Sequence, residues 1–128
     1  MSELILVVED RPLNAKLLRD VLRANGFQVI EAATGEDGVA LARERVPALV
    51  LMDIQLPGMD GIAALRELKA RPETAKIPVI AVTASALPME RQQILDAGFD
   101  GYQSKPLRVQ EMLGEVRRLL ARAPGDRP

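Results

Sequence analysis

The stretch ALVLMDIQLPGMDG, residues 48–61, decides the fold. The run from Ala48 to Met52 is apolar throughout, as in a strand of a parallel sheet whose two faces are both covered by helices. A carboxylate, Asp53, follows at the carboxyl end of this strand, and the Leu-Pro-Gly of residues 56–58 then turns the chain sharply. We therefore expect a buried parallel strand that ends in a charged residue at an edge of the sheet.

Outward from this stretch, strands alternate with helices. Apolar runs predict strands at residues 4–8, 27–32, 48–52, 77–82 and 101–104, those at 4–8, 48–52 and 79–82 being apolar on both faces. Apolar spacing predicts helices over 12–26, 35–45, a segment from Asp60 to Arg71–Pro72, 87–97 and 107–122. Thr34 and Asp60 are suited to cap two of these helices. Right-handed crossovers between the five strand–helix units give a doubly wound α/β sheet with five helices.

Two of the helices carry an apolar stripe. In the first helix we place Leu13, Leu17, Leu18, Val21 and Leu22 on one face. In the last helix the stripe consists of Val109, Met112, Leu113, Val116, Leu119 and Leu120. These faces are expected to pack on the sheet.

Composition fits one cytoplasmic globular domain. The 128 residues are 48% hydrophobic and 27% charged; we place the domain at residues 1–122 and a disordered tail or linker stub at 123–128. A net charge of −1, with two Phe, one Tyr and no Trp, argues against nucleic-acid binding. No apolar run reaches membrane-spanning length, and the N-terminus lacks a signal-peptide pattern. Because histidine and cysteine are absent, any chemistry must use Asp, Glu, Lys, Ser, Thr or Tyr.

Polar side chains follow four of the five predicted strands. Glu9 and Asp10 come after the first strand, Asp53 after the third, Thr83 after the fourth and Lys105 after the fifth. Since ligands of such sheets bind beyond the carboxyl ends of the strands, these residues are expected to share one crevice. Taken alone, each has a plainer explanation: a helix cap for Glu9–Asp10, a turn for Asp53, a strand end for Thr83 and a solvated lysine for Lys105. Their joint placement at one edge favours a site.

The chemistry of this set points to a metal and a phosphoryl group. Three neighbouring carboxylates repel one another, and a hard divalent cation such as Mg²⁺ relieves that repulsion. A lysine and a threonine hydroxyl beside Mg²⁺ are suited to receive a phosphoryl group, whose transfer depends on positioning and charge neutralisation. The nucleophile would be a carboxylate, which forms an acyl phosphate.

Four motifs, VVED at 7–10, LMDIQLPGMDG at 51–61, AVTASA at 81–86 and YQSKP at 102–106, carry a family resemblance. In order and spacing they resemble the receiver domain of two-component response regulators, over about residues 3–122. The resemblance implies a flavodoxin-like (CheY-like) sheet with strand order 2-1-3-4-5. VEDRPLNAKLL and LMDIQLPGMDG are similar to stand-alone receivers of the DivK type, so we expect a stand-alone receiver.

The resemblance also implies a role for each site residue. It makes Asp53 the phosphoacceptor and Lys105 the partner of the phosphoryl oxygens. The implied Mg²⁺ ligands are Asp10, Asp53 and the backbone carbonyl of Gln55, with Glu9 acting mainly through water. The implied switch pair is Thr83 and Tyr102, Tyr102 having core filler as its plainer alternative, and Pro106 is expected to follow a cis peptide bond. Gln55 and Ser85 stand where the family tunes dephosphorylation, and because both are uncharged the lifetime of the phosphoryl group is not predicted.

Partners follow from the same resemblance. A histidine kinase or histidine phosphotransfer protein is the implied donor, docking on the first helix near Asn14, Ala15 and Leu18. The implied signalling surface is the fourth helix, fifth strand and fifth helix, about residues 86–122, which would contact a downstream signalling protein. Its polar positions are rich in Arg and Gln, for which a solvated face is the alternative. Nucleic acid and membrane are not implied, and a homodimer formed on phosphorylation stays open.

Three other functions fit parts of the sequence. A haloacid-dehalogenase-type phosphatase needs a second Asp two residues after the nucleophile, where this chain has Gln55. A flavin- or nucleotide-binding module needs a Gly-rich loop after the first strand, where this chain has EDRPLN. A scaffold that is never phosphorylated is the third alternative, and the intact acceptor, carboxylates and lysine argue against it.

Overall fold

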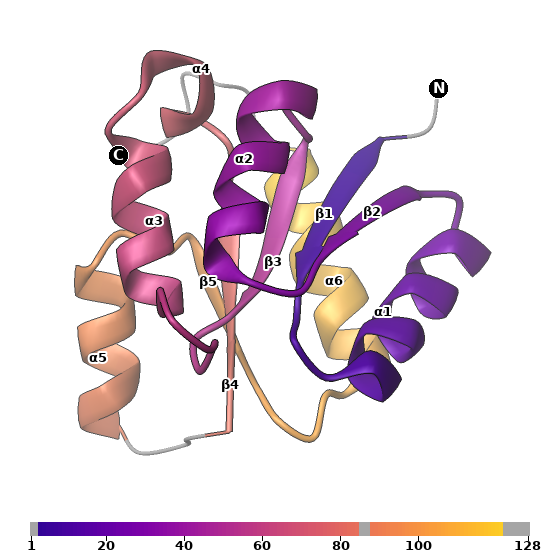
Figure 1. The fold of residues 1–128 in the computed structure, drawn as a ribbon. Helices are drawn as coiled ribbons and strands as arrows, with labels where there is room; N and C mark the ends of the chain where they lie inside the picture. The colour runs from indigo at the N-terminus through magenta and orange to yellow at the C-terminus, as the bar shows by residue number, and fades with distance from the viewer. Residues whose placement is uncertain (1–2, 85–87, 122–128) are drawn as a thin grey trace.

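A parallel sheet forms the centre of the molecule. The structure is a computed structural model, and it describes residues 3–84 and 88–121. The five strands lie in the order β2-β1-β3-β4-β5 (Figure 1). They are β1 (Leu4–Val8), β2 (Gln28–Ala32), β3 (Leu49–Asp53), β4 (Val79–Thr83) and β5 (Gly101–Ser104). The predicted sheet and strand order are confirmed; β1 and β5 have the predicted bounds, and the ends of the other strands differ by at most two residues.

The described part of the chain contains six helices, one more than predicted, of which all but the last lie between strands. They are α1 (Pro12–Ala24), α2 (Gly35–Arg45), α3 (Gly61–Lys69), α4 (Pro72–Ala75), α5 (Pro88–Asp96) and α6 (Val109–Leu120). The additional helix is the single turn α4, where the sequence indicated only a helix end. Pro72 ends one helix but also fits the first position of another, since that position needs no N–H donor. The Thr74 hydroxyl donates to the Leu68 carbonyl at 2.6 Å, which ties α4 to α3.

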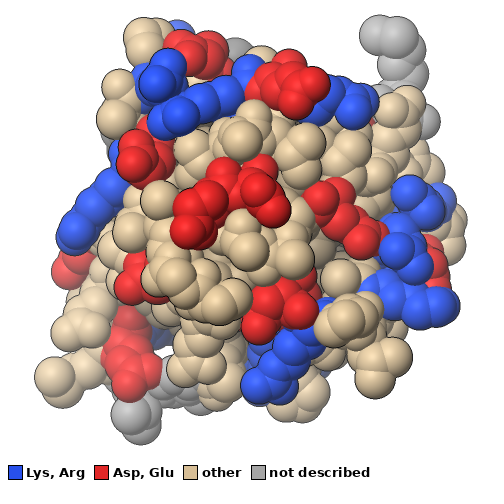
Figure 2. All heavy atoms as spheres, viewed as in Figure 1, with Lys and Arg blue, Asp and Glu red and all other residues tan. Residues whose placement is uncertain are grey.

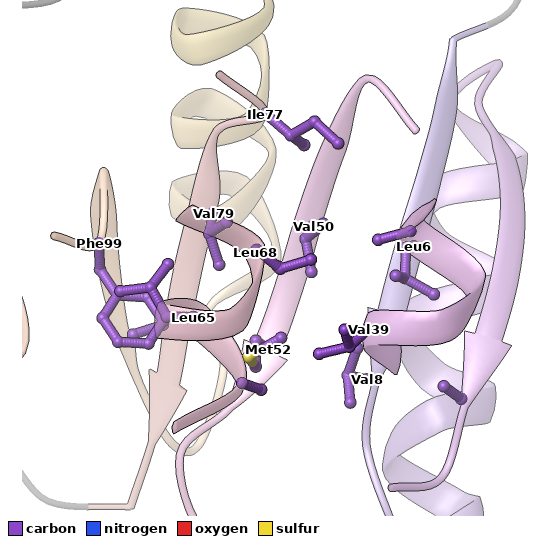
Figure 3. Packing of buried hydrophobic residues seen from close by; sticks show 14 of the residues in the cluster. Leu6, Val8, Val39, Val50, Met52, Leu65, Leu68, Ile77, Val79 and Phe99 are labelled. Carbon is purple, nitrogen blue, oxygen red and sulfur yellow. The ribbon is translucent and has the colours of Figure 1, made fainter. Parts of the chain in front are cut away.

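The sheet separates two apolar clusters. Leu6 and Val8 face the cluster that includes residues of α2, α3 and α5, whereas Ile5 and Val7 face α1 and α6. This alternation follows from the two-residue period of a strand. Figure 3 shows the first cluster, in which Val39 and Leu65 pack toward the sheet. Every residue of β3 and β4 is buried, as predicted for central strands with helices on both faces.

The outer face of α1 differs from the prediction. Ala15, Leu18 and Leu22, spaced three and four residues apart, are buried against the sheet. Leu13 is 82% exposed and Leu17 49% exposed, because they lie on the neighbouring face of the helix. Of the three residues predicted for the docking face, Ala15 and Leu18 belong to the buried side of α1, whereas Asn14 is partly exposed.

Both predicted caps are confirmed. The Thr34 hydroxyl accepts from the Asp37 N–H at 3.0 Å, and the Asp60 carboxylate accepts from the Ala63 N–H at 2.8 Å. Ser85 and the predicted tail at 123–128 lie outside the described residues. Within the ranges that are described, every helix falls short of the length and hydropathy that crossing a bilayer requires.

Candidate functional site

The sheet register places the predicted site residues side by side. Residues that pair across neighbouring strands are Val8 with Met52, Asp53 with Val82, and Thr83 with Ser104. Glu9 therefore leaves β1 beside Asp53, and Lys105 leaves β5 beside Thr83. The Lys105 N–H donates to the Thr83 carbonyl at 2.7 Å, which fixes the start of the loop that carries the lysine. Side chains far apart in sequence thus meet at the carboxyl edge of the sheet, as predicted.

Lys105 bridges two buried carboxylates. Its Nζ lies 2.8 Å from Asp53 Oδ2 and 3.2 Å from Glu9 Oε1. Asp53 is 4% exposed and Glu9 5% exposed, whereas the Lys105 side chain retains 21% exposure. Lys105 is therefore a partly buried ion-pair partner and not the solvated lysine that was its plainer alternative.

The remaining oxygen of each buried carboxylate accepts from the backbone. Asp53 Oδ1 accepts from the Gln55 N–H at 2.9 Å, and Glu9 Oε2 accepts from the Arg11 N–H at 3.2 Å. The turn and helix-start explanations are thus partly right, although the N-cap of α1 is Arg11 and has no side-chain cap bond. Each carboxylate is held at both oxygens, so its orientation toward Lys105 is well defined.

Asp10 completes a cluster of three acidic side chains. Glu9, Asp10 and Asp53 each offer a carboxylate oxygen, and these oxygens lie within 4.8 Å of one another. When all are ionised, the single ammonium of Lys105 leaves two negative charges uncompensated. Several carboxylate oxygens around one point are the donor set that Mg²⁺ prefers. The residues present therefore fit a divalent cation of this kind.

Burial and neighbouring charge shift two pKa values in this cluster. Burial raises the pKa of Glu9, and the Asp53 carboxylate raises it further, against the opposing effects of the Arg11 N–H and Lys105. Burial alone would lower the pKa of Lys105, but its hydrogen bonds and charge interactions with Asp53 and Glu9 outweigh burial and raise it. Lys105 is therefore charged at neutral pH and available to pair with an anion.

The predicted switch residues lie on β4 and β5. Thr83 is buried at the end of β4. Tyr102 is partly buried and packs against the cluster on the α3 and α5 side, so its core-filler role is real. The guanidinium of Arg91, on α5, lies 5.6 Å from the centre of the Tyr102 ring. The Lys105–Pro106 peptide bond is cis.

Comparison with known proteins identifies the class. The family model of the response regulator receiver domain matches residues 5–117. The chain therefore belongs to the receiver domains of two-component systems, which work with histidine kinases and downstream proteins. It is 40% identical over 123 residues to the polar-differentiation response regulators DivK of Brucella ovis and Brucella anthropi, covering 96% of this chain and 100% of each relative.

Solved structures agree with this class. The receiver domain of sensor histidine kinase PA1611 from Pseudomonas aeruginosa is 34% identical, with a TM-score of 0.88, covering 95% of this chain and 100% of that one. That structure contains a magnesium ion coordinated in its active-site cleft. A response regulator structure from Chloroflexus aurantiacus is 30% identical, with a TM-score of 0.91 and the same coverage. The predicted CheY-like fold is confirmed by a TM-score of 0.87 to the chemotaxis protein CheY4 of Vibrio cholerae, which is 21% identical and covers 93% of this chain and 99% of that one.

Removing the positive charge of Lys105 is expected to destabilise the protein when no metal is bound. In Lys105→Met, two buried carboxylates lose their shared partner, which is expected to lower the free energy of unfolding by roughly 1–3 kcal/mol. Mg²⁺ is expected to restore more stability to this variant than to the native chain, because no ammonium competes for the carboxylates. Urea unfolding in EDTA and in Mg²⁺ measures both effects.

The matched control is Lys16→Met, which removes an exposed lysine paired with Asp20 on α1. Exposed pairs contribute little to stability, so this variant is expected to unfold like the native chain. An equal response of Lys105→Met and the native chain to Mg²⁺ would contradict the proposed competition.

Proposed function

We propose that this chain is a response regulator that accepts a phosphoryl group on Asp53 in a Mg²⁺-dependent reaction and signals through a changed α5–β5–α6 surface. The observation that carries this proposal is the contact of Lys105 Nζ with Asp53, inside the cluster of three acidic side chains. The chain acts on itself, catalysing only its own phosphorylation and dephosphorylation. We place it in the cytoplasm.

Phosphoryl transfer to Asp53 depends mainly on the positioning of the reacting groups and on the neutralisation of their charge. One carboxylate oxygen of Asp53 forms the new P–O bond while the P–N bond of a donor phosphohistidine breaks, and the electron pair of that bond stays on the imidazole nitrogen. Asp10, Asp53 and the backbone carbonyl of Gln55 would hold Mg²⁺ directly, with Glu9 acting through water. When bound, Mg²⁺ supplies positive charge for the phosphoryl oxygens. Lys105 pairs with one of those oxygens after giving up its contact with the carboxylate.

The new group changes the local charge and hydrogen bonding. An acyl phosphate adds negative charge and acceptor oxygens, as phosphorylation does elsewhere. Thr83 hydrogen-bonds one of these oxygens, which opens space on its side of the sheet for Tyr102 to turn inward. The pair shifts a two-state equilibrium of the α5–β5–α6 surface, which corresponds to the predicted signalling surface. A downstream protein binds one state better than the other.

A small phosphodonor tests the proposal. The protein is incubated with acetyl phosphate in Mg²⁺ or in EDTA, and its intact mass is measured. We expect one phosphoryl group, labile to hydroxylamine, only in the Mg²⁺ sample. The absence of any adduct with acetyl phosphate and with a phosphorylated histidine kinase would favour a scaffold. Release of phosphate from many organic phosphates would favour a phosphatase.

The donor protein is proposed to dock on the exposed face of α1. Leu13 and Leu17 expose large apolar side chains there, and Leu17 lines a groove of about 170 Å³ together with Leu107, Pro106 and Lys105. An exposed apolar face beside the acceptor is suited to a partner that must deliver a phosphoryl group. This face keeps the predicted Asn14, which lines the same groove, but leaves out the buried Ala15 and Leu18.

Leu13→Asp is expected to slow transfer from a phosphorylated histidine phosphotransfer domain about tenfold, a loss typical of a substituted apolar contact residue. Phosphorylation by acetyl phosphate is expected to stay unchanged, because that donor needs no docking. Met89→Asp is the control, since Met89 is 77% exposed on α5, away from α1. Equal slowing in both variants, or slowing with acetyl phosphate, would exclude α1 as the docking face.

A further inference from the structure

Arg91 lies among the exposed Arg and Gln residues of the predicted signalling surface, and it contacts the ring of Tyr102. Its guanidinium lies 5.6 Å from the centre of the Tyr102 ring, within the range of a cation–π interaction. Arg91 is exposed on α5, and Tyr102 is half-buried on β5. The ring is thus held between the apolar cluster beneath it and a cation above it.

The location of this ring connects it to the acceptor site. Tyr102 pairs with Ala81 of β4, and Thr83 lies two residues further along the same strand. Because side chains two residues apart share one face of a strand, Thr83 and Ala81 point to the same side of the sheet as Tyr102. On this face of the sheet, the pair Ala81–Tyr102 is therefore followed directly by the pair Thr83–Ser104.

We propose that Arg91 is a positioning residue that holds the Tyr102 ring against α5 and thereby opposes activation. The proposal rests on the proposed function, in which the ring turns toward Thr83 when Asp53 is phosphorylated. That movement must give up the contact with Arg91, so the contact favours the unphosphorylated arrangement. An exposed cation–π contact of this kind corresponds to a shift of about two- to fivefold in the equilibrium between the two arrangements.

The composition of the chain supplies a specific probe. Tyr102 is the only tyrosine and the chain has no tryptophan, so intrinsic tyrosine emission reports on this ring alone. In the unphosphorylated full chain, Arg91→Gln is expected to increase quenching of this emission by acrylamide, because the ring loses its cover. Arg91→Lys retains a cation and is expected to give an intermediate value. After phosphorylation with acetyl phosphate and Mg²⁺, the native chain and Arg91→Gln are expected to quench alike.

The phosphorylation rate gives a second readout. Arg91→Gln is expected to react with acetyl phosphate about two- to fivefold faster than the native chain. Arg66→Gln, the same change at an exposed position of α3, is expected to leave rate and quenching unchanged. Unchanged quenching in Arg91→Gln, or equal effects in both variants, would overturn the proposal. A native chain that is never phosphorylated would contradict the proposed function instead, while the quenching of the unphosphorylated variants still decides whether Arg91 holds the ring.

Discussion

Asp53→Asn is expected to abolish phosphorylation, with no adduct detected by intact mass after incubation with acetyl phosphate and Mg²⁺. The variant replaces a carboxylate held by Lys105 and the Gln55 N–H with an amide of nearly the same shape. An amide oxygen lacks the negative charge that attacks phosphorus and that holds a divalent cation. The neighbouring carboxylates of Glu9 and Asp10 are not expected to replace it, because both follow β1 and neither stands at the end of β3.

Asp60→Asn is the matched control. It makes the same chemical change seven residues later, where the side chain caps α3 by accepting from the Ala63 N–H. Asparagine caps helices about as well as aspartate, so this variant is expected to fold and to be phosphorylated like the native chain. Phosphorylation of Asp53→Asn at the native level, or its equal loss in both variants, would contradict the assignment of Asp53 as acceptor.

Gly61→Ala is expected to cause the largest loss of stability among single-methyl substitutions near the site. A Cβ at Gly61 would lie 2.6 Å from the Asp53 carbonyl oxygen and 2.8 Å from the Ile54 Cα. Both atoms are backbone and cannot rotate away, so β3 or the start of α3 must shift. Overpacking of this kind lowers the free energy of unfolding by about 1–3 kcal/mol. Because the displaced backbone belongs to Asp53, phosphorylation is expected to slow as well.

Gly114→Ala isolates the effect of the clash. Gly114 is exposed within α6, and a Cβ there would have no neighbouring atom within 4 Å. Alanine favours the helix over glycine, so this variant is expected to be more stable by about 0.5–1 kcal/mol. Chemical denaturation of both variants measures the contrast. A Gly61→Ala protein as stable as the native chain would show that the loop after β3 can move away from the added methyl group without a loss of free energy of unfolding.

The fold was largely predictable because its strands are apolar on both faces and its helices have clear ends. Residues 48–52 can be buried on both sides only in a central strand, and β3 is buried at every position. The single turn α4 was missed because Pro72 serves both as a stop and as a first helical residue. The exposed face of α1 was mispredicted because leucine occurs on two adjacent faces, and only the packing of the sheet selects Leu18 and Leu22 over Leu13.

The meeting of the candidate site residues at one edge of the sheet could be predicted, but their individual contacts could not. Parallel topology alone brings the residues that follow each strand to one edge, so the meeting of Asp53, Glu9 and Lys105 follows from their positions. The N–H groups of Arg11 and Gln55 each donate to one carboxylate oxygen, which leaves the other oxygen to contact Lys105. This choice of oxygen depends on the backbone conformation after each strand. The contact of Arg91 with Tyr102 depends on the placement of α5 over β5, for which no sequence pattern exists. Figure 2 shows acidic groups at the centre of this face and also along its rim, where basic residues lie beside them, so surface charge alone does not mark a site.

The central claim is that Asp53 accepts a phosphoryl group because a divalent cation and Lys105 surround it. Borohydride reduction tests this claim most directly, since it converts an aspartyl phosphate into homoserine, a stable mark that peptide mass spectrometry locates. After incubation with acetyl phosphate, we predict homoserine at position 53 alone, and only when Mg²⁺ is present. Homoserine at position 10, a reduced residue at position 9, or an equal yield in EDTA would contradict the account.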